Sequence, residues 1–286
     1  EAMNTAYNNP KYILFDEIQN LPKWELFVNR LQRKGMNLII TGSNSNLLSK
    51  ELATHLTGRH LLISIFPFSF KEYLEISKKE QTSHQIKEKL GNFLVNGGYP
   101  EPLIKNIDYR DYLSTLFNSI VYKDIVKRYK IRFPQEIEEL AFYLLSNISN
   151  EFSYNSLSKL TKVKSIHTIQ KYLNYLEETF IFFKLNRFSY KVKEQISSNK
   201  KIYSIDNGFI NAKAFKASPD FGKLYENTVA QELYRDKMNA KLDFYYWKNQ
   251  QQEEVDFVVK EGVNIKQLIQ VCFDINDKKT ENREIR

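Results

Sequence analysis

Residues 12–19 read Tyr-Ile-Leu-Phe-Asp-Glu-Ile-Gln, a short apolar run followed by two adjacent carboxylates, Asp16 and Glu17. An apolar run of this length, bounded by polar residues, is typical of a strand buried in a parallel sheet. A second such run covers residues 37–40. Residues 22–34, between the two runs, begin with proline and carry apolar side chains at helical spacing, which predicts a helix. Strand, helix and strand together predict an α/β unit.

The two carboxylates fit the chemistry of nucleoside triphosphate hydrolysis. In that reaction one acid holds the Mg²⁺ shell and a second orients the attacking water, and Asp16 and Glu17 fit these two roles. The second strand ends in small polar residues, of which Ser43 and Asn44 are candidates for sensing the γ-phosphate. Carboxylates at the end of a strand can also simply solvate the following loop, so short motifs must be weighed together.

The rest of the sequence divides into segments by its apolar pattern. Residues 60–66 alternate like a third strand, and residues 69–130 turn helical with a Gly-Gly-Tyr-Pro break at 97–100. Residues 134–190 predict three helices and then a β-ribbon within 181–188, which is the order of a winged helix-turn-helix. Beyond residue 200 an α/β pattern returns, with strands expected at 201–204, 243–247, 254–259 and 267–273, one helix ending near 214 and another at 221–238.

Positive charge is concentrated in one segment. The chain has a formal net charge of +8, and residues 152–201 alone carry ten Lys or Arg against three Glu, a net charge of +7. A localised basic field indicates an anionic partner such as nucleic acid, although such a run is often a solvated face. The candidates for DNA contact are His167, Thr168, Gln170 and Lys171 on the third helix and Lys184, Arg187, Lys191 and Lys193 on and after the ribbon.

Composition narrows the cellular setting. No apolar run approaches the roughly 18 residues of a membrane helix, and the first nine residues are too polar for a signal peptide. The single cysteine, Cys272, cannot form an internal disulfide or a cysteine-based metal site, which is typical of a reducing compartment. We therefore expect a cytoplasmic protein without membrane contact. The missing initiator methionine and an end inside an apparent helix predict a fragment.

In several short stretches the sequence resembles the AAA+ ATPases of bacteria and archaea that carry a nuclease-like C-terminal domain. The resemblance implies that Asp16, as metal ligand, and Glu17 form Walker B, that Ser43 or Asn44 is sensor 1, and that Arg59 faces the nucleotide, although Arg59 also fits a salt bridge at a domain seam. ATP and Mg²⁺ would be the cofactors of the intact protein. The stretches that carry the resemblance are residues 12–19, 40–43, 56–59, 66–73, 98–100, 224–227 and 254–257.

One element of that family is missing from the sequence. The phosphate-binding loop G-x-x-x-x-G-K-[S/T] does not occur, and the only Gly-Lys pair, Gly222-Lys223, has Ala217 where the first glycine should be. Backbone N–H groups and the lysine of that loop hold the phosphates. We therefore expect this chain to bind no ATP tightly, and we interpret the absence as truncation.

The C-terminal segment resembles a metal-dependent nuclease whose catalytic end is altered. Glu226 and Asp256 match the two carboxylates that would bind a divalent metal. The third position requires Glu-x-Lys, but the sequence has Gln270 and Cys272 there. An amide is a weak ligand for Mg²⁺ and a thiol supplies no fixed positive charge. A retained scaffold without hydrolysis is therefore the prediction.

The sequence as a whole predicts an α/β multidomain protein. Its function would be that of an ATPase fragment whose hydrolysis switches C-terminal modules that bind DNA or protein. The alternatives are a catalytically silent module that binds DNA, a protein partner or a second copy, and an active metal-dependent DNA nuclease. The predicted domains are a partial AAA+ core at 1–75, a helical lid at 76–130, a winged helix at 131–192 and a restriction-endonuclease-like α/β domain at 193–286.

Overall fold

The acid-bearing strand predicted from residues 12–19 forms and pairs with the second predicted strand. The computed structural model describes residues 10–43, 60–77, 81–215, 220–239 and 241–273. The chain separates into two units, residues 1–64 and 65–286. In the first unit, β1 (Tyr12–Phe15) runs parallel to β2 (Asn37–Ile40), so the carboxyl ends of both strands lie at the same edge.

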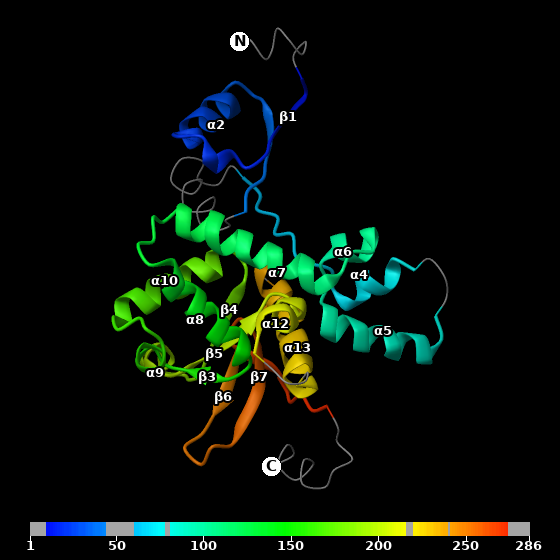
Figure 1. The fold of residues 1–286 in the computed structure, drawn as a ribbon, viewed down its shortest axis with the longest axis vertical. Helices are drawn as coiled ribbons and strands as arrows, with labels where there is room; N and C mark the ends of the chain where they lie inside the picture. Colours follow the sequence, from blue (N-terminus) through cyan, green and yellow to red (C-terminus); the bar gives the residue numbers. More distant parts are fainter. Residues whose placement is uncertain (1–9, 44–59, 78–80, 216–219, 240, 274–286) are drawn as a thin grey trace. The chain divides into compact units, whose positions relative to one another are not determined.

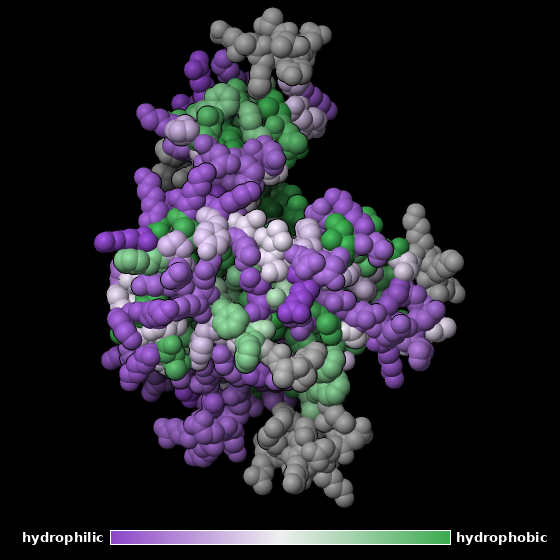
Figure 2. Space-filling model, in the orientation of Figure 1, coloured by the Kyte–Doolittle hydropathy of each residue, from purple (hydrophilic) through white to green (hydrophobic). Residues whose placement is uncertain are grey.

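The connection between these strands is helical, as predicted. The short η1 (Ile18–Asn20) precedes α2 (Trp24–Arg33), and Trp24 is buried against Ile18. Figure 2 nevertheless shows apolar surface over the first unit, and Leu14 in β1 is 65% exposed. The predicted strand-helix-strand order is confirmed.

The third strand predicted at residues 60–66 is wrong. These residues form no strand, and Leu61 and Ile65 are 86% and 91% exposed. Alternation of apolar side chains indicates a strand only where a neighbouring strand takes the backbone hydrogen bonds and a core takes the side chains. Among the described residues no strand pairs with this segment, and of its apolar side chains only Phe66 packs against the core.

The second unit begins with the predicted helical region, broken at the two glycines. Its helices are α4 (Phe70–Glu75), α5 (Ser83–Asn96), α6 (Pro100–Lys105), α7 (Tyr109–Ser119) and the π-helix η2 (Ile120–Lys127). Both α4 and α5 begin with a capping box, which satisfies two backbone N–H groups that a helix start would otherwise leave unpaired. Gly97 ends α5 at φ +78°, a left-handed conformation that glycine adopts without steric cost.

Helices and strands then alternate around a small antiparallel sheet. In chain order the elements are α8 (Pro134–Ser146), β3 (Glu151–Phe152), α9 (Tyr154–Leu160), α10 (Ile166–Glu178), β4 (Phe182–Asn186), α11 (Val192–Ser197) and β5 (Lys200–Ser204). The strand order is β3-β5-β4, with β5 antiparallel to both neighbours. The three predicted helices are therefore present.

The ribbon predicted within residues 181–188 is wrong. Only β4 lies there, and its partner is β5, which follows α11. A ribbon within eight residues requires a tight turn with glycine, asparagine or aspartate at its centre, and the only such residue in 181–188 is Asn186, the last residue of β4. The strand expected at 201–204 thus completes this sheet and does not open the next one.

The C-terminal elements agree with the predicted α/β pattern. They are α12 (Asn207–Lys213), α13 (Phe221–Met238), β6 (Asp243–Lys248), β7 (Glu254–Glu261) and β8 (Asn264–Ile269). The three strands form an antiparallel sheet in the order β6-β7-β8. Because β8 ends at Ile269, Gln270 and Cys272 follow the strand and do not lie within it, contrary to the prediction.

One hydrophobic core runs through the second unit. Its buried side chains extend from Leu94 in α5 to Val259 in β7 and include members of both small sheets. Figure 1 shows the strands in the middle of this unit, with α8, α9 and α10 to one side and α12 and α13 to the other. The chain therefore has a mixed α/β fold with three small sheets, one of them in the first unit.

Asp206 ties the glycine break to the start of α12. Its carboxylate accepts hydrogen bonds from the backbone N–H of Gly98 at 2.7 Å and of Gly208 at 2.8 Å. Gly98 O in turn accepts from Phe68 N at 2.8 Å. Burial raises the pKa of Asp206 to about 7, although the two backbone N–H groups act in the opposite direction. Three segments far apart in the sequence are held at this point.

Replacing Gly98 by alanine should disrupt this junction. The added Cβ would lie 2.2 Å from the carbonyl oxygen of Phe68, and a backbone oxygen cannot move away as a flexible side chain would. We expect Gly98→Ala to lower the free energy of unfolding by about 1–3 kcal/mol, measured by urea denaturation. Gly91→Ala is the control, because its Cβ would meet nothing within 4 Å inside α5. Equal effects of the two changes would contradict the close contact of Gly98 at this junction.

Asp206 should also make stability depend on pH. Because its pKa is raised to about 7 in the folded state, the folded protein binds this proton more tightly than the unfolded chain. The stability contributed by Asp206 is therefore largest near pH 4 and falls as the pH rises to 7, by up to about 1.4 kcal/mol per pH unit. Melting curves between pH 5 and 8 should show this slope in the wild type and a shallower one in Asp206→Asn. Equal slopes in the wild type and in Asp206→Asn would refute the role of Asp206 in this pH dependence.

Candidate functional site

Polar side chains meet at the edge where β1 and β2 end. Asp16 accepts a hydrogen bond from the Thr41 hydroxyl, and Thr41 Oγ1 accepts from the backbone N–H of Glu17 at 3.4 Å. The carboxylate of Glu17 accepts from Gln19 Nε2 at 2.6 Å and from Ser43 Oγ at 3.3 Å. Glu17 has φ 48°, an uncommon backbone conformation for a residue other than glycine. The edge therefore holds two carboxylates and two hydroxyls.

Most of the residues predicted for this site come together. Asp16, Glu17 and Ser43 lie in one hydrogen-bonded group, whereas Asn44 and Arg59 lie outside the described residues. Sequence reasoning missed Thr41, which contacts both acids. Its position directly after the second apolar run was the available signal, because parallel strands deliver their carboxyl ends to the same edge.

The group suits the metal side of a nucleotide site. Asp16 is exposed and its carboxylate is of the oxygen-ligand type that Mg²⁺ prefers. Glu17 is held by two donors, which fixes the direction of its carboxylate. Nothing in the sequence supplies the Gly-Lys loop that holds phosphates. Asp16 would hold the metal and Glu17 would face water. Such a site would still need a loop that binds the phosphates.

A second candidate surface lies on α10. Its buried side includes Ile169 and Leu173, both 0% exposed, and the opposite side exposes His167, Gln170 and Lys171. The helix is capped at its N-terminus by Ser165, whose hydroxyl accepts from Thr168 N. Figure 2 shows mainly hydrophilic surface over this part of the second unit.

Two of the predicted DNA-contacting cations, Lys184 and Arg187, contact other elements of the fold, and a third, Lys191, pairs locally with Glu194 at 3.1 Å. Lys184 Nζ lies 2.5 Å from Glu177 Oε2, in a pair that is about one-quarter exposed. Burial raises the pKa of Glu177, while Lys184 opposes that rise. Arg187 donates to the backbone carbonyl of Lys248 in β6. These two side chains therefore hold elements of the fold together, unlike Lys171.

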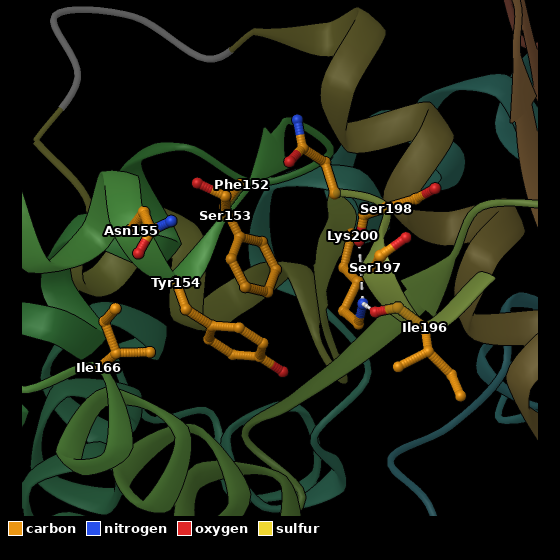
Figure 3. A pocket seen from close by; sticks show the side chains of 10 residues that line it. Phe152, Ser153, Tyr154, Asn155, Ile166, Ile196, Ser197, Ser198 and Lys200 are labelled. Carbon is orange, nitrogen blue, oxygen red and sulfur yellow. Dashed lines mark hydrogen bonds between the residues drawn. The ribbon is translucent and has the colours of Figure 1, made fainter. Parts of the chain in front are cut away.

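A small cavity lies between the start of α9 and the end of α11. Its volume is about 180 Å³, below the roughly 300 Å³ at which ligand pockets usually begin. Lys200 Nζ donates to the carbonyls of Ile196 and Ser198 at 3.0 and 2.9 Å, as Figure 3 shows. The lysine therefore stabilises the end of α11. The lining is formed by Phe152, Ser153, Tyr154, Asn155, Ile166, Ile196, Ser197, Ser198, Asn199 and Lys200.

The carboxylates predicted for the nuclease-like site come together around a lysine. Lys201 Nζ lies 2.9 Å from Glu226 Oε1, 2.5 Å from Glu254 Oε1 and 3.3 Å from Asp256 Oδ1. Gln270 Oε1 accepts from Asp256 N at 3.2 Å. Sequence reasoning identified Glu226, Asp256 and Gln270 but missed Lys201 and Glu254. A lysine inside an apolar strand was the only signal for Lys201.

The rest of this region offers few further ligands. Cys272 lies two residues beyond Gln270 and is half-buried. Across residues 10–43, 60–77, 81–215, 220–239 and 241–273, no group of three or more His, Cys, Asp or Glu side chains is arranged to hold a metal ion. No helix in these ranges is long and apolar enough to cross a membrane.

Comparison with protein families divides the chain into three matched stretches. Residues 1–74 match an AAA domain. Residues 87–220 match a domain of unknown function, DUF8612, and residues 221–285 match another, DUF4143. No solved structure matches the chain significantly.

Three proteins from an archaeon and a bacterium, each described only as uncharacterized, are similar to the chain. One from Methanocaldococcus jannaschii is 38% identical over 98% of this chain and 65% of its own length, so the chain spans about two thirds of that relative. A second protein of this archaeon is 24% identical over 80% of the chain and 54% of its own length. A protein from Haemophilus influenzae is 32% identical over 95% of the chain and 68% of its own length. The chain therefore belongs to the same family as the Haemophilus influenzae protein, and its residues 1–74 match an AAA domain.

Proposed function

We propose that the protein is a P-loop-type ATPase in which hydrolysis in the AAA unit changes the conformation of the C-terminal modules. One observation carries this proposal: Asp16 and Glu17 leave β1 at the edge where Thr41 leaves β2, joined by hydrogen bonds. The AAA match over the same residues supports it. Bound Mg²⁺ and ATP would supply the electrophilic phosphorus and neutralise its charge.

The residues of this chain have separate roles in that proposal. The exposed carboxylate of Asp16 would bind the metal shell, and Thr41 fixes its direction. Glu17 would accept a hydrogen bond from the attacking water, and Gln19 and Ser43 limit its rotation. A preoriented carboxylate lowers the barrier because less ordering remains for the reaction step. The backbone of the phosphate-binding loop must come from sequence that this chain does not contain.

In the full-length protein, Glu17→Gln should retain nucleotide binding and lose hydrolysis. The amide keeps the shape of the side chain but cannot act as a base toward water, which is worth about 10²–10⁴-fold in rate. Phosphate release and nucleotide affinity should be measured on the same preparation. Glu25→Gln in α2 is the matched control. Wild-type turnover in Glu17→Gln would remove Glu17 from the mechanism.

A second candidate function is DNA binding by the segment from α8 to β5. Its element order, with strands arranged β3-β5-β4, favours a winged helix in which α10 is the recognition helix. The exposed side of α10 carries His167, Gln170 and Lys171 and no carboxylate over its first two turns. Because β5 belongs to this sheet, we propose Ser204 as the end of the module in place of residue 192. A nuclease-like domain would then follow.

The other two functions receive less support. A silent module would use the same α10 surface, or the exposed apolar surface of the first unit, to bind a protein partner or a second copy. An active nuclease would need carboxylates open to a metal, and Lys201 lies among them. Cytoplasmic location remains our expectation from composition.

The lysines of this segment should separate into two groups in a DNA-binding experiment. We expect micromolar affinity for duplex DNA with little sequence preference, because phosphate contacts carry no sequence information. Lys171→Ala should lower the salt slope by about 1 and leave the melting temperature unchanged. Lys184→Ala should instead lower the free energy of unfolding, by about 1–3 kcal/mol before discounting for partial exposure, because Glu177 loses the ammonium and keeps the backbone N–H of residue 184.

The two measurements also test the alternative. If the exposed side of α10 packs on a protein partner, Lys171→Ala will leave DNA affinity and its salt dependence unchanged. Fluorescence anisotropy over a range of salt concentrations, together with thermal melting of each variant, provides both readouts.

A further inference from the structure

A buried ammonium group lies at the centre of three carboxylates. Lys201 is 3% exposed, and its Nζ contacts oxygens of Glu226 in α13 and of Glu254 and Asp256 in β7, at 2.5–3.3 Å. Tyr203 donates to Glu226 at 2.7 Å, and Val271 N donates to Asp256 at 2.9 Å. The carboxylates are therefore held in direction by neutral donors as well as by the lysine.

As they lie around Lys201, these carboxylates of the described chain are not arranged to hold a metal ion, but they would face one another without that ammonium if the lysine were absent. Carboxylate oxygens converging on one point are the donor set of Mg²⁺ and Mn²⁺. A buried lysine is otherwise costly, since a desolvated charge must be paired and hydrogen-bonded to be retained. Lys201 meets that condition completely, with one carboxylate for each of its three N–H donors. The chain supplies its own cation.

The surroundings of Lys201 Nζ favour an organic cation. The ammonium also lies over the ring of Tyr246, whose centroid is 5.8 Å away. An aromatic face stabilises an ammonium through its quadrupole, whereas a hydrated divalent ion needs further oxygen ligands. A second lysine, Lys248, pairs with Glu254 at 3.4 Å and with Glu151 at 3.0 Å. Two lysines thus share four carboxylates in this region.

We propose that Lys201 is the built-in cation of this carboxylate site, where it takes the place of a divalent metal and joins β5 to α13 and β7. Because β5 also pairs with β3 and β4, the site connects the sheet that supports α10 to the C-terminal sheet. The connection requires no metal. It is independent of the proposed ATPase activity.

Lys201→Met tests the proposal directly. The change removes the charge and keeps an unbranched apolar side chain, so that Glu226 and Asp256 lose their cation while Glu254 keeps Lys248. We expect the melting temperature to fall by about 10 °C, and we expect millimolar Mn²⁺ to restore part of that loss. Electron paramagnetic resonance should detect one more saturable Mn²⁺ site in Lys201→Met than in the wild type, whose melting temperature should be equal in EDTA and in Mn²⁺.

Lys200→Met is the matched control. Lys200 is the preceding residue of the same strand and is also buried, but its Nζ contacts backbone carbonyls and no carboxylate. It should therefore gain no Mn²⁺ binding and lose less stability than Lys201→Met. If Lys201→Met does not fold, the triple change Lys201→Met with Glu226→Gln and Glu254→Gln should recover folding, because it removes charge of both signs.

Four results would overturn the proposal. The first is saturable Mn²⁺ binding by the wild type that Asp256→Asn abolishes, since the position would then be open to metal. The second is a folded Lys201→Met protein that binds no more Mn²⁺ than the wild type. The third is equal loss of stability in Lys200→Met and Lys201→Met. The fourth is a triple variant that remains unfolded.

Discussion

The second unit depends on the carboxylate of Asp206, which is buried yet accepts hydrogen bonds from two backbone N–H groups. One of these belongs to the glycine break after α5 and the other to the first turn of α12. Burying a carboxylate is unfavourable unless such donors are present. A Cβ on Gly97 would lie 1.8 Å from the carboxylate and one on Gly98 would lie 2.2 Å from the carbonyl oxygen of Phe68, so only glycines allow this close approach. The helical region and the C-terminal elements share one core because this junction holds them together.

The same junction anchors the first residues of the second unit. Arg235 in α13 donates to the carbonyl of Pro67 and lies 5.2 Å from the ring centroid of Phe66. Phe66 also packs edge-on against Phe180 and Tyr234. The first residues of the second unit are therefore held at both backbone and side chain before α4 begins.

Local patterns in the sequence predicted the elements well where a local cause determines them. The runs ending at Asp16 and at Ile40 became strands because they are short, apolar and bounded by polar residues, and α13 was bounded correctly by its helical pattern. The strand at 60–66 failed because alternation does not reveal whether a neighbouring strand exists. The site around Lys201 was predicted only in part, because a local pattern does not reveal which distant residues meet. Lys201 meets carboxylates from two elements that come later in the chain, and no local spacing encodes that meeting.

Two neighbouring lysines have a consequence for how β5 is aligned in its sheet. The loop from β4 to β5 contains α11 and no tight turn, so it cannot fix the pairing as a hairpin turn does. Successive side chains of a strand point to opposite faces, and here Lys200 caps the end of α11 while Lys201 enters the carboxylates. If β5 slipped by one residue, either Ile202 or Lys200 would take the place of Lys201 beside the carboxylates. Lys201 would then point to the opposite face, away from its carboxylate partners. Electrostatics thus sets the register of this strand, a task that turns perform elsewhere.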